Sequence, residues 1–275
     1  MKISEWKWKS FDGLDMYARG WAPDGKLKAV LVLVIGLGEH VCRYEHVGAA
    51  LTAKGYALLG FDLRGHGKSG GPRGHSPSTE AFMQDIDLMR KQVDARYPGI
   101  PQFLYGHSLG GMLTLNYILD RQPMLTGAVV TAPALRSALE TQKVKVLMAK
   151  VLGTLLPSAS LPSGLDSDML SHVPEVVDCY KQDPLVHDKV SFGMAKNLLE
   201  MIGWTYAHAK DLKIPLLLMH GSDDQVAYAR GSREFSEKAG DKVTLKIWDG
   251  MYHEIHNEPG QEQVFVYMLD WLGKH

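Results

Sequence analysis

The chain has 275 residues, 45% of them hydrophobic, and its 30 basic and 31 acidic residues leave a formal charge of -1. A chain of this length can bury a large core, and we expect one domain with an insertion. The balanced charge provides no basic field for nucleic acid and no strong attraction to an anionic membrane. We therefore expect a small, uncharged partner and no nucleic-acid partner.

The sequence pattern contains neither a secretion signal nor a membrane span. The first ten residues lack an apolar stretch of signal-peptide length, and the longest apolar run, residues 29–35, is too short to cross a bilayer. Cys42 and Cys179 lie far apart in the chain, and without an export signal a disulfide is not expected. We expect a cytoplasmic protein, whose oligomeric state the sequence does not specify.

The predicted elements alternate as in an α/β protein. An antiparallel hairpin is predicted over residues 6–9 and 14–21, around the turn at Asp12-Gly13. Buried apolar runs and amphipathic stretches then alternate, which predicts a doubly wound α/β fold with a mostly parallel sheet and helices on both faces. The strands are expected at 29–36, 56–62, 103–106, 127–131, 215–220 and 243–248, and the helices at 43–54, 79–96, 109–121, 191–209, 230–239 and 260–272.

The alternation breaks in a proline-containing segment of some fifty residues. We interpret residues 134–189 as an inserted cap (lid) on a core formed by residues 1–133 and 190–275. Residues 143–156 have apolar side chains at helical spacing. Two interpretations of this helix stay open: it packs on the core, or it is a lid that covers an acyl channel and transiently contacts lipid interfaces.

The pentapeptide Gly106-His107-Ser108-Leu109-Gly110 matches the Gly-x-Ser-x-Gly nucleophile elbow, which presents a serine on a strained strand-to-helix turn. A predicted strand precedes it and a predicted helix follows it, so Ser108 is the candidate nucleophile. The alternative is a serine that caps an ordinary helix.

A serine hydroxyl is activated by a histidine that takes its proton and by a carboxylate that orients this histidine. In α/β-hydrolases the order along the chain is serine, acid, histidine. Asp223 and Asp224 follow the predicted strand 215–220, at the sheet edge where open sheets bind ligands. The last predicted strand leads to His253 and His256. One of the two aspartates is the predicted acid, and His253 is the favoured base.

An oxyanion hole requires two backbone NH groups, one from the residue after the nucleophile and one from the loop after an earlier strand. Leu109 is the first candidate. Leu37, in the loop Ile35-Gly36-Leu37-Gly38, is the second.

Together these motifs resemble the monoacylglycerol lipases and lysophospholipase-type serine hydrolases of the α/β-hydrolase superfamily, from about residue 10 to the C-terminus. The resemblance implies the α/β-hydrolase fold and ester hydrolysis. In the family's Gly-Ser-x-Asp and Tyr-His patterns it selects Asp224 as the acid and His253 as the base. The motifs that carry it are Gly36-Leu-Gly-Glu-His40 with Arg43-Tyr44, Asp62-Leu-Arg-Gly-His-Gly-Lys-Ser69, Gly106-His-Ser-Leu-Gly-Gly111, Asp183-Pro-Leu185, Gly221-Ser-Asp-Asp224 and Tyr252-His253.

The resemblance also implies a polar recess for a glycerol head group, formed by Glu39, Arg43, Tyr180 and His256. Simpler roles stay open for each of them: a surface ion pair between Glu39 and Arg43, a solvated loop residue at His256, and a core aromatic at Tyr180. The family usually has histidine where this chain has Ile35. A backbone oxyanion donor is compatible with that change, and we count Ile35 among the residues expected to set head-group preference.

Metal and nucleotide chemistry are not expected. His253 and His256 do not form the His-Glu-x-x-His zinc motif, no cysteine cluster exists, and residues 65–69 lack the frame of a phosphate-binding loop.

The sequence therefore predicts a cofactor-independent hydrolase of monoacylglycerols or similar single-chain esters. Ser108 forms an acyl-enzyme, His253 acts as base and then acid, Asp224 orients His253, and water completes deacylation. The alternatives are a general carboxylesterase, a lysophospholipase, acyl transfer to an alcohol or amine, and, outside enzymes, a lipid-binding receptor with a hydrolase fold. Ile35 motivates the last two.

Overall fold

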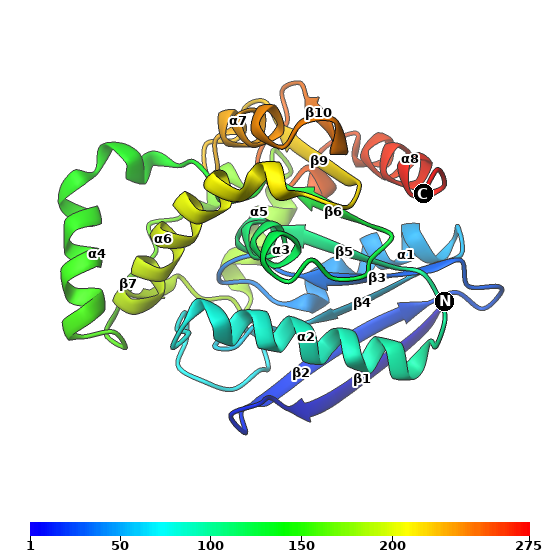
Figure 1. The fold of residues 1–275 in the computed structure, drawn as a ribbon, viewed down its shortest axis with the longest axis horizontal. Helices are drawn as coiled ribbons and strands as arrows, with labels where there is room; N and C mark the ends of the chain where they lie inside the picture. The colour runs from blue at the N-terminus through cyan, green and yellow to red at the C-terminus, as the bar shows by residue number, and fades with distance from the viewer.

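The apolar runs form one eight-stranded sheet in a computed structural model that describes the backbone of residues 1–275 (Figure 1). The side chains of residues 139, 141 and 143–145 lie outside the described part. The strand order is β1-β2-β4-β3-β5-β6-β9-β10, parallel from β4 to β10, with β1 and β2 antiparallel. The strands are β1 (Lys2–Lys9), β2 (Asp15–Ala22), β3 (Ala29–Val34), β4 (Tyr56–Phe61), β5 (Gln102–His107), β6 (Gly127–Thr131), β9 (Leu216–Gly221) and β10 (Val243–Trp248).

The central strands owe their place in the sheet to unbroken apolar composition. Every residue of β3, β4, β5, β6 and β9 is buried, as expected for parallel strands that are covered on both faces. β1 alternates exposed and half-buried side chains along its second half, because it lies at the edge of the sheet. The predicted α/β fold is confirmed.

Helices cover both faces of the sheet. α1 packs beside α8 on one face, and α2 packs beside α3 on the other (Figure 1). Ser78 caps α2 and Ser191 caps α6, each accepting a hydrogen bond from a backbone NH in the first turn. The helices of the core are α1 (Glu45–Thr52), which follows a short 3-10 helix at Val41–Tyr44, α2 (Thr79–Arg96), α3 (Leu109–Asp120), α6 (Phe192–His208), α7 (Ala229–Ala239) and α8 (Gln261–Leu272).

The segment between β6 and β9 departs from the alternating pattern. It contains α4 (Lys143–Leu155), α5 (Pro174–Gln182) and a separate antiparallel pair of β7 (Ser160–Pro162) with β8 (Lys189–Ser191). The predicted helix at 143–156 is confirmed as α4, whereas α5 was not predicted. The predicted boundary between residues 189 and 190 falls inside β8.

α4 lies at the far end of the molecule from α8 and rests on α6 (Figure 1). The contact is close because Gly153 has no side chain, and a Cβ at this position would press against the backbone of Phe192 and the side chain of Lys196. Ala149 is buried on the same side of the helix. Among the described residues, no helix is both long enough and apolar enough to span a bilayer.

Candidate active site

Ser108 occupies the sharp turn between β5 and α3. Its backbone has φ 54° and ψ -117°, a conformation that residues other than glycine rarely adopt. Gly110 makes the turn feasible, because a Cβ there would collide with the carbonyl oxygens of Val34 and Ile35 at the end of β3. The Ser108 side chain makes no capping hydrogen bond to α3, so the helix-capping alternative is wrong.

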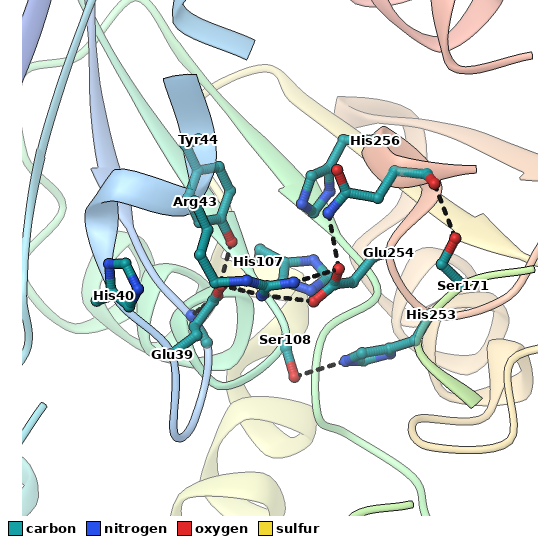
Figure 2. A network of polar contacts seen from close by, with 12 residues as sticks. Glu39, His40, Arg43, Tyr44, His107, Ser108, Ser171, His253, Glu254 and His256 are labelled. Atoms are coloured by element: carbon teal, nitrogen blue, oxygen red, sulfur yellow. Dashed lines mark hydrogen bonds and ion pairs between the residues drawn. The ribbon is translucent and has the colours of Figure 1, made fainter. Parts of the chain in front are cut away.

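Three predicted residues from distant parts of the chain meet at this turn. Ser108 Oγ lies 2.9 Å from His253 Nε2 (Figure 2), and His253 Nδ1 lies 2.7 Å from Asp224 Oδ2. All three are buried. The hydroxyl, the imidazole and the carboxylate therefore form one continuous chain of hydrogen bonds. Asp223, the other candidate acid, instead bonds Ser222 through its side chain.

The environment separates the charge states of this acid and base. Burial favours the neutral form of His253, but the charge of Asp224 outweighs it and raises the pKa of the imidazole. Burial alone would also raise the pKa of Asp224, yet the charge of His253 and a hydrogen bond from His220 hold the pKa of this carboxyl below its ordinary range. His253 can accept a proton from Ser108 while Asp224 stays ionised.

The backbone amides of Leu37 and Leu109, the predicted oxyanion donors, have no acceptor within the described residues. Leu109 is the first residue of α3, and Leu37 lies in the loop after β3. The neighbouring NH of Gly36 is occupied by Glu39 Oε1 at 2.5 Å, whereas the NH groups of Leu37 and Leu109 donate to no partner among the described residues. Both amides therefore stay candidates for binding an oxyanion.

A recess lies at Ser108 and is lined in part by the inserted segment. Its volume is about 220 Å³. Leu165, Leu170 and Tyr180 contribute from the inserted segment. The other lining residues are Gly36, Leu37, Glu39, Arg43, His107, Ser108, His253 and Glu254.

A buried charge network forms the polar end of this recess (Figure 2). The Arg43 guanidinium donates to Glu39 Oε2 at 2.8 Å and to both oxygens of Glu254 at 2.7 and 2.8 Å. It also lies 4.8 Å from the centre of the Tyr180 ring. The Glu39–Arg43 pair is therefore made, but it is buried and not a surface ion pair, with side-chain exposures of 3% and 11%.

The pKa shifts in the network follow from its opposite charges. Burial would raise the pKa of Glu254, but Arg43 holds the pKa of this carboxyl far below its ordinary value. The two carboxylates in turn raise the pKa of Arg43 against the effect of its burial. Glu254 and Arg43 are therefore both ionised at neutral pH.

Two predicted recess residues lie behind the lining. Ile35 is fully buried in the hydrophobic core. His256 is 1% exposed, which excludes a solvated loop residue, and its ring stacks on Tyr44 with centroids 5.1 Å apart. Neither belongs to the residues that line the recess.

Sequence reasoning missed Glu254 and His220. Glu254 follows His253 directly, but its partner Arg43 is 211 positions away. His220 precedes the acid by four positions and bonds the same carboxylate. A search for charged residues beside the predicted base and for histidines at strand ends would have found both. The described residues contain no cluster of three or more His, Cys, Asp or Glu side chains that could hold a metal ion.

Comparison with known proteins relates the chain to hydrolases. The family described as serine aminopeptidase, S33, matches residues 25–260. The chain is 34% identical to a monoacylglycerol lipase of Mycolicibacterium smegmatis, over 99% of this chain and 98% of that protein. The crystal structure of Paleococcus ferrophilus monoacylglycerol lipase has 34% identity and a TM-score of 0.84, over 99% and 98% of the two chains. An abhydrolase domain-containing protein of Dictyostelium discoideum is 40% identical over 92% of this chain, but the chain spans only 27% of that protein.

Proposed function

We propose that this chain cleaves monoacylglycerols or similar single-chain esters through Ser108. The chain belongs to the serine aminopeptidase S33 family of α/β-hydrolases, and it is a carboxylic ester hydrolase related to monoacylglycerol lipases. The observation that carries the proposal is the hydrogen-bonded chain from Ser108 through His253 to Asp224. This order of nucleophile, base and orienting acid activates a serine at neutral pH.

The reaction has two halves. Ser108 Oγ attacks the ester carbonyl while His253 Nε2 takes its proton, and Asp224 stabilises the imidazolium that forms. The imidazolium then gives this proton to the departing alcohol oxygen, which leaves an acyl group on Ser108. Water, deprotonated by His253, attacks the acyl-enzyme and releases the fatty acid. The amides of Leu37 and Leu109 stabilise the oxyanion in both halves.

The buried network supports an uncharged, hydroxyl-bearing head group. Arg43 is the one guanidinium in the recess lining, against the carboxylates of Glu39 and Glu254, so the lining has a formal charge of -1. Three hydrogen bonds of the Arg43 guanidinium already go to these carboxylates. A phosphate group would be repelled by the net negative charge of the lining, whereas glycerol hydroxyls can donate to the carboxylate oxygens. This argument favours monoacylglycerol over lysophospholipid.

The inserted residues 134–189 act as a cap in this proposal. Leu165, Leu170 and Tyr180 line the recess from the inserted segment, and its volume of about 220 Å³ is small for a long acyl chain. Access for the substrate therefore requires these side chains to move apart from the loop that contains Leu37.

Replacement of Ser108 by alanine tests the nucleophile. We expect Ser108→Ala to reduce the turnover of monooleoylglycerol by about four orders of magnitude or more, and to abolish covalent labelling by a fluorophosphonate probe. Ser222→Ala, another serine at a strand end, is the control and should retain both. Retained hydrolysis in Ser108→Ala contradicts the proposal, and lipid binding without labelling or turnover in the unaltered protein favours the receptor alternative.

A substrate panel tests the head group. Monooleoylglycerol, methyl oleate and oleoyl lysophosphatidylcholine share one acyl chain, and we expect monooleoylglycerol to be cleaved with the highest kcat/KM, by about ten-fold or more. Equal turnover of the lysophospholipid contradicts the charge argument. Preference for p-nitrophenyl acetate indicates a general carboxylesterase, and ester products formed when an alcohol is added indicate acyl transfer.

A further inference from the structure

Asp224 is bound by a second histidine that the proposed reaction does not use. His220, in β9, is fully buried, and its Nε2 lies 2.9 Å from Asp224 Oδ2 and 2.6 Å from the carbonyl oxygen of Ala227. Its Nδ1 lies 2.7 Å from Ser232 Oγ in α7. The ring thus connects the predicted acid to two structural elements behind the site.

The partners determine where the ring proton is. A carbonyl oxygen only accepts hydrogen bonds, and so does the ionised carboxylate of Asp224. Nε2 must therefore carry a proton and donate it to both. Ser232 can then donate its hydroxyl proton to Nδ1, which leaves His220 with a complete set of partners and no need for a positive charge beside His253.

His220 and His253 share one oxygen of the acid. His253 Nδ1 is 2.7 Å from the same Oδ2, while Oδ1 accepts the amides of Val226 at 2.8 Å and Ala227 at 2.9 Å. The carboxylate therefore has two donors on each oxygen, which leaves it one orientation. Since Oδ2 serves both histidines, part of its negative charge is already engaged before His253 is protonated.

We propose that His220 is a positioning residue, which holds Asp224 in the orientation that His253 requires and limits how strongly Asp224 stabilises the protonated form of His253. The inference rests on the proposed function, in which Asp224 is the orienting acid. His220 does not touch the substrate or Ser108.

Loss of the His220 donor should change the pH dependence of activity in a defined direction. Without this donor, more negative charge on Asp224 Oδ2 acts on His253 and stabilises its protonated form. The acid limb of the activity profile should therefore move to higher pH. Besides Asp224, the groups that act on His253 are Glu254 and Glu39, together with the neighbouring imidazoles of His107 and His256. The substitution leaves these four side chains as they are.

Two amide substitutions separate the roles of the two ring nitrogens. His220→Gln can place an NH2 near the position of Nε2 and keep the donor to Asp224. His220→Asn reaches only the position of Nδ1, so it keeps a partner for Ser232 and loses the donor to Asp224. Met219→Leu, a buried change in the same strand away from the carboxylate, is the control.

We expect His220→Asn to lower kcat for monooleoylglycerol about ten-fold with KM nearly unchanged, and to move the acid limb of the kcat/KM profile upward by about half a pH unit. His220→Gln and Met219→Leu should stay within about two-fold of the unaltered protein. If the two amide variants lose activity equally with the acid limb in place, His220 is a packing residue and the inference is wrong.

A measurement without turnover separates this inference from the proposed function. The proton between His253 and Asp224 gives a low-field NMR resonance, which should shift in His220→Asn and stay in His220→Gln. If His220→Asn does not fold, Ser232→Ala, which releases the far side of the ring, should produce a smaller shift in the same direction. Full activity of Ser108→Ala would overturn the proposed function. If Ser108→Ala is inactive but His220→Asn leaves both the resonance and the pH profile unshifted, only the role of His220 is overturned.

Discussion

At the scale of single residues, the site depends on strain and burial at a few positions. Ser108 is held at a positive φ, and the cost of this conformation is met by the packing of β5 and α3 around it. The Arg43 guanidinium is buried between two carboxylates, and removal of this guanidinium would leave both carboxylates without their charged partner. Exposed residues could not supply either feature, because water would relax the turn and screen the charges.

The pH profile of ester hydrolysis should report the protonation of His253. Asp224 raises the pKa of His253 above its ordinary value of 6.5, and only the unprotonated imidazole can accept the proton of Ser108. Activity should therefore fall as the pH decreases through a midpoint above 6.5, which kcat/KM between pH 5 and pH 9 would measure.

The variant Asp224→Asn checks the cause of this midpoint. Without the carboxylate charge, the acid limb should move to lower pH, and the rate should fall by about four orders of magnitude. A midpoint below 6.5 in the unaltered protein would contradict the prediction.

At the scale of elements, α4 combines a packed side with an exposed apolar side. Ala149 and Gly153 pack against α6, whereas several apolar side chains of the helix are exposed. Leu147 is 62% exposed and Leu155 is 69% exposed. α4 therefore packs on α6 and also exposes apolar side chains, and we propose that this exposed side contacts lipid interfaces.

We therefore expect Leu155→Glu to reduce binding to phospholipid vesicles and hydrolysis of vesicle-bound monooleoylglycerol by about thirty-fold, because a buried leucine side chain contributes about 2 kcal/mol. Hydrolysis of soluble p-nitrophenyl acetate should not change. Thr154→Glu adds the same charge at a neighbouring exposed polar position and should have a much smaller effect. Equal losses in both variants would attribute the effect to charge alone, against an apolar contact.

At the scale of the whole molecule, folding buries histidines that the unfolded chain exposes to water. Burial lowers the pKa of His66 to about 3 and that of His256 to about 3. The unfolded chain binds protons at these positions below the ordinary value of 6.5, whereas the folded chain does not. The stabilising contribution is therefore complete above pH 6.5 and is lost as the pH falls toward 3.

The substitution His66→Asn tests this linkage. His66 donates from Nδ1 to the carbonyl oxygen of Arg64 at 2.9 Å, and its Nε2 has no partner. Asparagine keeps a donor near Nδ1 but does not titrate. We expect the slope of the unfolding free energy against pH, measured near pH 5 by denaturant titration, to decrease by about one proton. An unchanged slope would show that His66 is not protonated on unfolding.

The sequence by itself determined the features that depend on local patterns and on the order of residues along the chain. Unbroken apolar runs such as residues 29–34 identify buried parallel strands, and the elbow around Ser108 is a local pattern. The chain order of serine, acid and histidine left Asp223 and Asp224 open as the acid, and the family's Gly-Ser-x-Asp pattern then selected Asp224.

Only the tertiary structure decided which residues surround that constellation. Glu39 and Arg43 could be read as a surface pair until Glu254, 211 positions from Arg43, closed the network and buried it. Ile35 and His256 were expected at the recess and lie behind it, and His220 was not expected at all. A side chain's burial and partners depend on which elements pack against it, and contacts between distant segments leave no periodic or local trace in a single sequence.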